Sequence, residues 1–236
     1  MVRFEEFICL LKIEDEIQLQ NKHILDISSP FQMAYILSEN NTVIKTDINI
    51  NEKSCIKENE NLSFRTENAT SIAFKDNTFD FVYSISVIEH IYDNYLVAIN
   101  EMIRVVKPGC YVYITFPISN THIEEWIDRD SYSNQHKKKS MFFFQYRFSC
   151  YDVNHIKKNI IGAEVVKEYI FWEKKSGSYN NAINMLNKYN RKIFFNLIIN
   201  TAINNFYSFF LMESFERKEY LKPFGNIQIL LKKYPL

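Results

Sequence analysis

The sequence predicts an α/β fold in which helices cover both faces of a doubly wound, mostly parallel sheet. Residues 1–120 alternate between short apolar runs of strand character and amphipathic helical segments, which is the pattern of βαβ units. Apolar residues make up 47% and charged residues 24% of the 236-residue chain, both ordinary values for a globular protein. Two of the apolar runs end in or near an aspartate, as expected where parallel strands present their carboxyl ends to a ligand.

The N-terminal elements follow from the spacing of apolar residues. Residues 1–22 are expected to form a helix, followed by a strand at 23–27, a helix at 31–40 and a strand at 42–50. The polar segment 51–67 is expected to be a loop or a short helix. The apolar face of the first helix is expected to carry Phe4, Phe7, Ile8, Leu11 and Ile17.

The middle and C-terminal elements are expected as four strands and two helices. A strand at 79–87 leads to an amphipathic helix at 96–106, which should end at Lys107, Pro108 and Gly109 because Pro and Gly stop helices. A strand is expected at 111–117. The last expected elements are a strand at 162–174, a long helical stretch at 180–220 and a strand at 226–234.

The apolar segment 193–212 approaches the length of a membrane span. Asn196, Asn200, Asn204 and Ser208 recur every four residues in it and draw a polar stripe along an apolar helix. Asparagines are costly at bilayer depth, so a transmembrane span is the weakest interpretation. A buried or lid helix is favoured over a dimer helix or a membrane-surface helix.

Charge and cysteine content narrow the choice of function. The 28 basic and 28 acidic residues cancel, but residues 1–130 hold 11 basic against 21 acidic and residues 131–236 hold 17 against 7. This balance disfavours a uniformly basic nucleic-acid binder. The basic part would suit a small anionic substrate, a membrane surface or the acidic half of another copy in a homodimer, or it is simply solvated. The four cysteines form no zinc spacing, and reduced thiols in a cytoplasmic, at most peripherally membrane-bound, protein are expected.

Two aspartates mark the expected ligand-binding edge. Asp26 lies in the first strand, before Ser28 and Ser29, and Asp47 lies toward the end of the second strand. In nucleotide-binding α/β folds an acid about 20 residues after the first turn holds ribose hydroxyls, because a carboxylate accepts two hydroxyl protons well.

The middle of the chain carries a more specific pattern. Residues 67–91 read ENATSIAFKDNTFDFVYSISVIEHI, and residues 101–117 read EMIRVVKPGCYVYITFP. In order and spacing this resembles the class I S-adenosylmethionine-dependent methyltransferases, in the broad type 11-like group that modifies small molecules. The matched stretch runs over residues 23–117.

The resemblance implies a Rossmann-like, seven-stranded, mostly parallel sheet whose last strand is antiparallel, in a single domain over 1–236. The cofactor-binding core would be 23–117 and the lid or substrate segment 118–160. The stretch 180–220 would be a helical insertion between the last two strands.

The resemblance also implies residue roles toward S-adenosylmethionine. Asp26 and the turn after it, Ile27, Ser28 and Ser29, would contact its methionine part, and Asp47 its ribose, with Ile48 packing on the adenine. The adenine edge would be read by Asn68 and by the backbone N–H of Ala69, and Ser84 and Ile85 would line the pocket. No metal is expected.

One departure concerns the first turn. The family has Asp-x-Gly-x-Gly-x-Gly there, whereas this chain has Asp26-Ile27-Ser28-Ser29-Pro30-Phe31-Gln32 without any glycine. Glycine allows positive φ and close approach of the backbone to the cofactor. Either the turn takes another shape that still holds the cofactor, which is favoured, or the chain is a non-catalytic binding or scaffold subunit.

The acceptor side offers fewer signals. His90 and His122 each follow a strand and are candidate general bases, because histidine titrates near neutrality. Tyr146 and Arg147, near the lysine run 137–139, would meet a small polar or anionic acceptor such as a sugar, nucleotide-linked or glycan-precursor metabolite. The signature of amino methylation on nucleic-acid bases is missing after 111–117, so no nucleic-acid substrate is expected.

Overall fold

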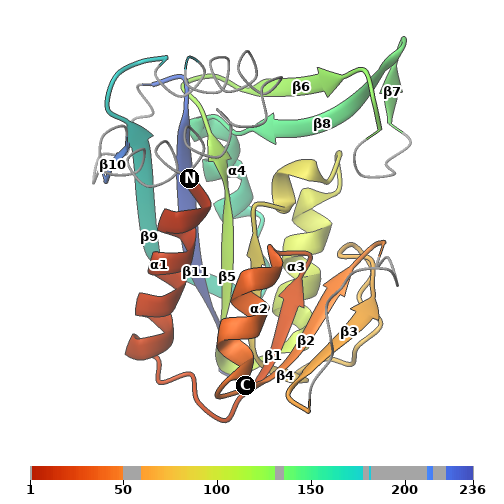
Figure 1. The fold of residues 1–236 in the computed structure, drawn as a ribbon, viewed down its shortest axis with the longest axis vertical. Helices are drawn as coiled ribbons and strands as arrows, with labels where there is room; N and C mark the ends of the chain where they lie inside the picture. The colour runs from red at the N-terminus through yellow and green to blue at the C-terminus, as the bar shows by residue number, and fades with distance from the viewer. Residues whose placement is uncertain are drawn as a thin grey trace, which may run out of the picture.

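The computed structural model describes residues 2–49, 60–130, 136–177, 181, 212–214 and 222–235. Within them, one sheet of eight strands organises the molecule (Figure 1). Its order is β10-β9-β11-β5-β4-β1-β2-β3. The strands are β1 (His23–Ile27), β2 (Thr42–Asp47), β3 (Leu62–Thr66), β4 (Phe79–Ile85), β5 (Val106–Ile118), β9 (Ala163–Glu173), β10 (Met212–Ser214) and β11 (Gly225–Lys233).

The pairing of the strands confirms the predicted sheet. Strands β3, β2, β1, β4 and β5 pair in parallel, and β11 inserts antiparallel between β5 and β9. Seven strands thus have the expected arrangement with the last one antiparallel, and the short β10 adds an eighth, antiparallel to β9. The chain moves from β1 outward to β3 and then returns to β4 on the other side of β1. The order therefore reverses between β1 and β4, and such a point is where open α/β sheets bind ligands.

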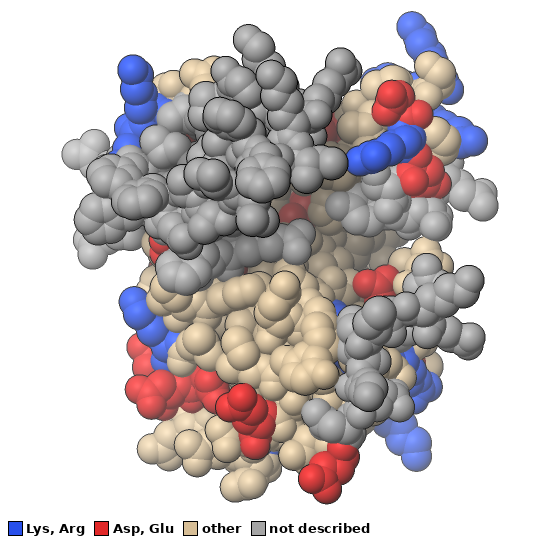
Figure 2. Space-filling view, in the orientation of Figure 1, with Lys and Arg blue, Asp and Glu red and all other residues tan. Residues whose placement is uncertain are grey.

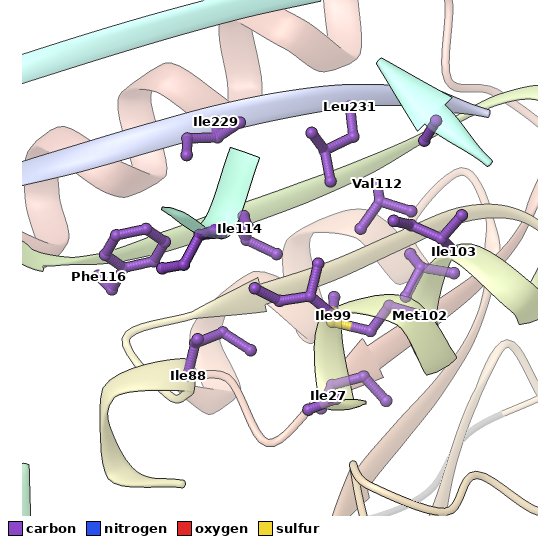
Figure 3. Packing of buried hydrophobic residues seen from close by; sticks show 14 of the residues in the cluster. Ile27, Ile88, Ile99, Met102, Ile103, Val112, Ile114, Phe116, Ile229 and Leu231 are labelled. Carbon is purple, nitrogen blue, oxygen red and sulfur yellow. The ribbon is translucent and has the colours of Figure 1, made fainter. Parts of the chain in front are cut away.

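Helices cover both faces of the sheet (Figure 1). One face packs against α1 (Val2–Glu16) and α2 (Phe31–Ser38), and the other against α3 (Tyr95–Val105) and α4 (Cys150–Lys158). Figure 3 shows Ile99 and Met102 of α3 beside Ile27 of β1, with Val112 and Ile114 of β5 nearby. All five side chains are essentially fully buried. Apolar burial on both faces explains why the central strands have nearly continuous apolar sequences.

The segment predicted as a lid, 118–160, forms a second sheet and α4. Strands β6 (Ile123–Ile127), β8 (Met141–Arg147) and β7 (Lys137–Lys138) pair antiparallel in the order β6-β8-β7. This small sheet lies beyond the ends to which the arrows of β1, β2 and β4 point (Figure 1). It is fixed to the main sheet by Phe148, whose N–H donates to Pro117 O and whose carbonyl accepts from Ser119 N.

Three sequence expectations need correction. The segment 51–67 contains a strand, β3, which was missed because only Leu62 of its five residues is buried. Strand β5 begins at Val106, directly after α3, so it includes Lys107, Pro108 and Gly109 and starts before the expected 111–117. The buried face of α1 carries Glu6, Cys9, Leu10 and Ile13, whereas Phe7, Ile8, Leu11 and Ile17 are half-buried.

Other expectations fall outside the described residues. The expected helical stretch 180–220 is wrong at Met212–Ser214, which form strand β10 because they pair with β9. Apart from Asn181 and β10, the stretch 180–220 and the polar stripe at 193–212 lie outside the described residues and stay predictions. No helix in the described part of the chain is long and apolar enough to cross a membrane.

Figure 2 shows acidic side chains gathered at the lower left, near the end of α1, where Glu14, Asp15 and Glu16 follow one another.

Candidate functional site

A cavity of about 360 Å³ lies at the carboxyl ends of β1, β2 and β4, where the strand order reverses. Each of the loops that follow β1 to β4 contributes to its wall. His136, which directly precedes β7 of the small sheet, also lines the cavity. Its described lining consists of Ser28, Ser29, Pro30, Asp47, Ile48, Glu67, Asn68, Ala69, Thr70, Ile85, Ser86, Val87, His90, Ile91, Tyr92, Asn94 and His136.

The glycine-free turn after β1 adopts a conformation that glycine usually supplies. Ser28 has φ +53°, in the left-handed region, at a cost of roughly 1–2 kcal/mol for a residue with a side chain. Its N–H donates to Thr46 O at 2.9 Å, and Ser29 Oγ accepts from Ile85 N at 2.9 Å. The turn is therefore held to both neighbouring strands, and its serines reach the cavity without glycine.

Asp26 is fully buried beneath this turn and does not line the cavity. Its Oδ1 accepts from Ser29 N at 2.8 Å, and its Oδ2 accepts from Tyr83 Oη at 2.8 Å. Burial, together with the Asp26 carboxylate, raises the pKa of Tyr83 well above its usual value, so the phenol stays a donor. Asp26 therefore contacts the turn that lines the cavity and not the cavity itself.

Ile27 and Ser84 are buried as well and lie outside the cavity lining. Ser84 Oγ donates to Ile27 O at 3.1 Å, which joins β4 to the end of β1. The next residue, Ile85, lines the cavity as expected.

Asp47 and Asn68 reach the cavity from the ends of β2 and β3. Asp47 Oδ1 accepts from Asn49 N at 3.1 Å. Asn68 Oδ1 already accepts from Thr70 N at 3.0 Å and Thr70 Oγ1 at 2.9 Å, so both of its lone-pair directions are engaged. Ile48 is 53% exposed, which leaves an apolar side chain at the cavity rim for a ligand to cover.

Ser86, at the end of β4, connects the cavity to the N-terminal helix. Ser86 has φ +52°, and its Oγ donates to Glu6 Oε1 at 2.8 Å. The same buried oxygen of α1 accepts from Asn226 Nδ2 at 3.0 Å and from Thr115 Oγ1. Sequence reasoning missed this network, because an acid in a predicted amphipathic helix is normally assigned to its solvent face.

His90 is the histidine that reaches the cavity from the loop after β4. Its Nδ1 lies 2.7 Å from Phe144 O, and a carbonyl oxygen only accepts, so Nδ1 carries a proton. In the neutral ring Nε2 is then the basic nitrogen, and it lies 3.8 Å from Glu89 Oε1.

The comparisons with known proteins agree with this geometry. Residues 28–114 match the family described as "Methyltransferase domain", and they contain every cavity-lining residue except His136. This stretch of the chain is similar to a methyltransferase domain. The fold resemblance expected from residues 23–117 is thereby confirmed.

Two curated relatives match part of the chain. An uncharacterized protein of Methanocaldococcus jannaschii is 33% identical over 132 residues, which are 54% of each chain. Norajmaline N-methyltransferase of Rauvolfia serpentina is 44% identical over 55 residues, which are 23% of this chain and 18% of that enzyme. The chain thus matches about half the length of the first relative and under a fifth of the second.

Solved structures agree with the fold at low identity. Coclaurine N-methyltransferase, bound to N-methylheliamine and SAH, has a TM-score of 0.58 and 13% identity, covering 97% of this chain and 71% of that one. A likeness at this identity extends the methyltransferase fold beyond the matched family segment to nearly the whole chain.

Apart from His90, the residues expected on the acceptor side lie outside the cavity lining. His122 is 45% exposed in its side chain, and its Nδ1 lies 2.9 Å from Asp152 Oδ2. Burial raises the pKa of Asp152, but hydrogen bonds from Ser149 and His122 outweigh this effect and bring the pKa below its usual value. Asp152 also closes a capping box with Ser149 at the start of α4, so His122 is part of a surface arrangement that supports this helix.

Tyr146 and Arg147 are structural in this geometry. Tyr146 is 4% exposed and packs against Phe143 and Phe148. Arg147 pairs with Glu125 and lies over the ring of Phe224, 5.3 Å from its centroid. Lys137 and Lys138 are exposed on β7.

Sequence reasoning missed the residues that stand at the cavity beside His90. Tyr92 and His136 lie with ring centroids 4.5 Å apart, and Asn94 precedes α3. Tyr92 and Asn94 directly follow the Glu-His-Ile segment that the resemblance identified, and this position in the sequence was the available signal.

Proposed function

We propose that the chain is a methyltransferase that uses S-adenosylmethionine and acts on a small polar acceptor. One observation carries the proposal: the cavity of the methyltransferase domain lies at the strand-order reversal and is bounded by the turn after β1 and by Asp47 after β2. Ligands of open α/β sheets bind at this place, and an acid after the second strand suits a ribose.

The lining divides into a cofactor side and an acceptor side. Asp47 would accept hydrogen bonds from the ribose hydroxyls, and the exposed Ile48 would pack on the adenine. Ala69 would donate its N–H to the adenine edge. Ser28 and Ser29 would bind the methionine part through the turn that Asp26 holds from below.

When bound, S-adenosylmethionine supplies a methyl group already activated on a sulfonium. The protein therefore has to align the acceptor, exclude water and remove a proton. His90 would take that proton, because it lines the cavity and its Nε2 is the basic nitrogen of the neutral ring when Nδ1 donates to Phe144 O. Tyr92, Asn94 and His136 would orient the acceptor beside it.

The carboxylates of the lining do not select the acceptor. Asp47 is assigned to the ribose, and Glu67 pairs with Arg65, whose Nε lies 2.7 Å from Glu67 Oε1. We favour an acceptor that reacts through a hydroxyl oxygen, such as a sugar, because a general base such as His90 can take the proton that the hydroxyl loses. A small amine is the second candidate, because two proteins similar to this chain are named N-methyltransferases.

Calorimetric titration with S-adenosylmethionine and S-adenosylhomocysteine tests the proposal. We expect dissociation constants of about micromolar for both ligands. The loaded protein is then incubated with sugars, nucleosides, amines and phosphorylated sugars, and formation of S-adenosylhomocysteine is measured. Absence of binding of either ligand at about millimolar concentration would overturn the proposal and favour a non-catalytic binding or scaffold subunit.

A further inference from the structure

The strands beneath the cavity carry a buried row of three polar side chains. Lys45 of β2 pairs in register with Asp26 of β1, and Asp26 pairs in register with Tyr83 of β4. The three residues are 8%, 0% and 0% exposed. They lie side by side across the sheet, directly below the turn of Ser28 and Ser29.

Each member of the row contacts the next member or the turn. Lys45 Nζ lies 3.4 Å from Asp26 Oδ2 and donates to Ser29 O at 2.5 Å. Tyr83 Oη donates to Asp26 Oδ2 at 2.8 Å, and Asp26 Oδ1 accepts from Ser29 N at 2.8 Å. Both the N–H and the carbonyl of Ser29 are thus held by side chains of the row.

Burial of a lysine in this position costs desolvation free energy, so we ask what the lysine provides that an apolar side chain cannot. The sheet here is buried, and a buried ion pair is often no more stabilising than well-packed apolar residues of similar volume. What Lys45 adds is a donor for the carbonyl of Ser29. That carbonyl belongs to a turn with left-handed φ at Ser28 and with no glycine to ease it.

We propose that Lys45 is a positioning residue that, with Asp26 and Tyr83, holds the glycine-free turn in the shape that binds the methionine part of the cofactor. The inference rests on the proposed function. Lys45 acts through Ser29 and does not itself line the cavity. In the family, glycines permit the backbone conformation of this turn. Here the turn has no glycine, and hydrogen bonds from the row hold it in place.

The test compares Lys45→Met with wild type in calorimetric titrations of S-adenosylhomocysteine and of adenosine. Loss of a charge-assisted hydrogen bond should weaken S-adenosylhomocysteine binding by about tenfold to a hundredfold. Adenosine lacks the methionine part, so its binding does not depend on the turn of Ser28 and Ser29. The affinity of Lys45→Met for adenosine should therefore be within about twofold of the wild-type affinity. Equal losses for both ligands, or none for S-adenosylhomocysteine, would overturn the proposal.

Lys107→Met is the matched control, because Lys107 forms another lysine–aspartate pair, with Asp80 Oδ1 at 2.7 Å, away from the cavity lining. Its affinities for both ligands should equal those of wild type. If Lys45→Met does not fold, Tyr83→Phe removes one hydrogen bond from the same row and should lower the affinity for S-adenosylhomocysteine alone, by about three- to tenfold. An unchanged affinity in Tyr83→Phe would then contradict the proposal.

If the wild-type protein binds neither ligand, the proposed function is refuted. The positioning role of Lys45 is then tested by a second measurement that needs no ligand. Amide hydrogen exchange at Ser29, whose N–H is bonded to Asp26, should be faster by about tenfold in Lys45→Met than in Lys107→Met. Equal protection of Ser29 in the two variants would overturn the positioning role itself.

Discussion

Asp47 stands at the end of β2 with its carboxylate at the cavity wall. We expect Asp47→Ala to weaken S-adenosylhomocysteine binding by well over tenfold, because hydrogen bonds to a charged group are each worth about 1.5–3 kcal/mol. Calorimetric titration measures this loss, and the exposed Glu164 of β9 provides the control Glu164→Ala. An unchanged affinity in Asp47→Ala would remove Asp47 from the proposed site.

His90 and His122 have different surroundings, and the difference leads to a prediction. His90 lines the cavity, whereas His122 pairs with Asp152 outside its lining. We expect His90→Gln to slow turnover by about 10²- to 10⁴-fold while leaving the affinity for S-adenosylhomocysteine nearly unchanged, as loss of a general base does.

The matched variant His122→Gln should keep wild-type turnover, because its side chain supports α4 and not the cavity. Initial rates at saturating cofactor and acceptor measure both variants. A slow His122→Gln enzyme beside a normal His90→Gln enzyme would reverse the assignment of the base.

At the scale of elements, Gly225 allows β11 and β9 to approach each other closely where their pairing begins. A Cβ added at Gly225 would overlap the ring of Trp172 and lie 2.8 Å from Phe171 O. We expect Gly225→Ala to lower the free energy of unfolding by about 1–3 kcal/mol, because over-packing displaces side chains and backbone. Urea denaturation measures the change.

Ser63→Ala on the edge strand β3 is the control, since Ser63 is exposed and its loss should change stability by less than about 0.5 kcal/mol. Equal stabilities of Gly225→Ala and wild type would show that the β9–β11 pair adjusts without cost.

The predictability of an element depended on how it is buried. Strand β4 is buried along almost its whole length and was recognised from its apolar run. Edge strand β3 pairs with β2 alone and has only one buried residue, so its sequence reads as a loop. In α1 the position of Glu6 is set by Ser86, Thr115 and Asn226, three partners distant in the sequence.

At the scale of the whole molecule, three carboxylates that accept hydrogen bonds make the free energy of unfolding depend on pH. The hydrogen bond from Arg104 lowers the pKa of Glu101 below 4.5. For Asp80 and Asp152 burial raises the pKa, but hydrogen bonds from Lys107 and from Ser149 outweigh it and bring the pKa below 3.8. Because these values are lower in the folded state, the stabilisation is present above the unfolded values and is lost as pH falls through the folded ones.

We therefore expect the free energy of unfolding to be steady from about pH 7 to about pH 5 and to fall steeply below about pH 4. Urea denaturation across this range measures it. Arg104→Met should be less stable at neutral pH and should lose less stability between about pH 5 and about pH 3, because Glu101 no longer has its donor. The same loss in wild type and in Arg104→Met would contradict this assignment.

The sequence by itself determined the strand–helix order, the class of the sheet and the positions of Asp47, Ser28, Ser29 and His90 at one edge. These follow from local apolar spacing and from the rule that parallel strands end together. Only the tertiary structure decided that Asp26 faces Lys45 and Tyr83 instead of the cavity, and that His122, Tyr146 and Arg147 lie outside the cavity lining with partners of their own. The physical reason is that these roles depend on partners from other strands, and pairing register across a sheet is a non-local property that sequence spacing does not record.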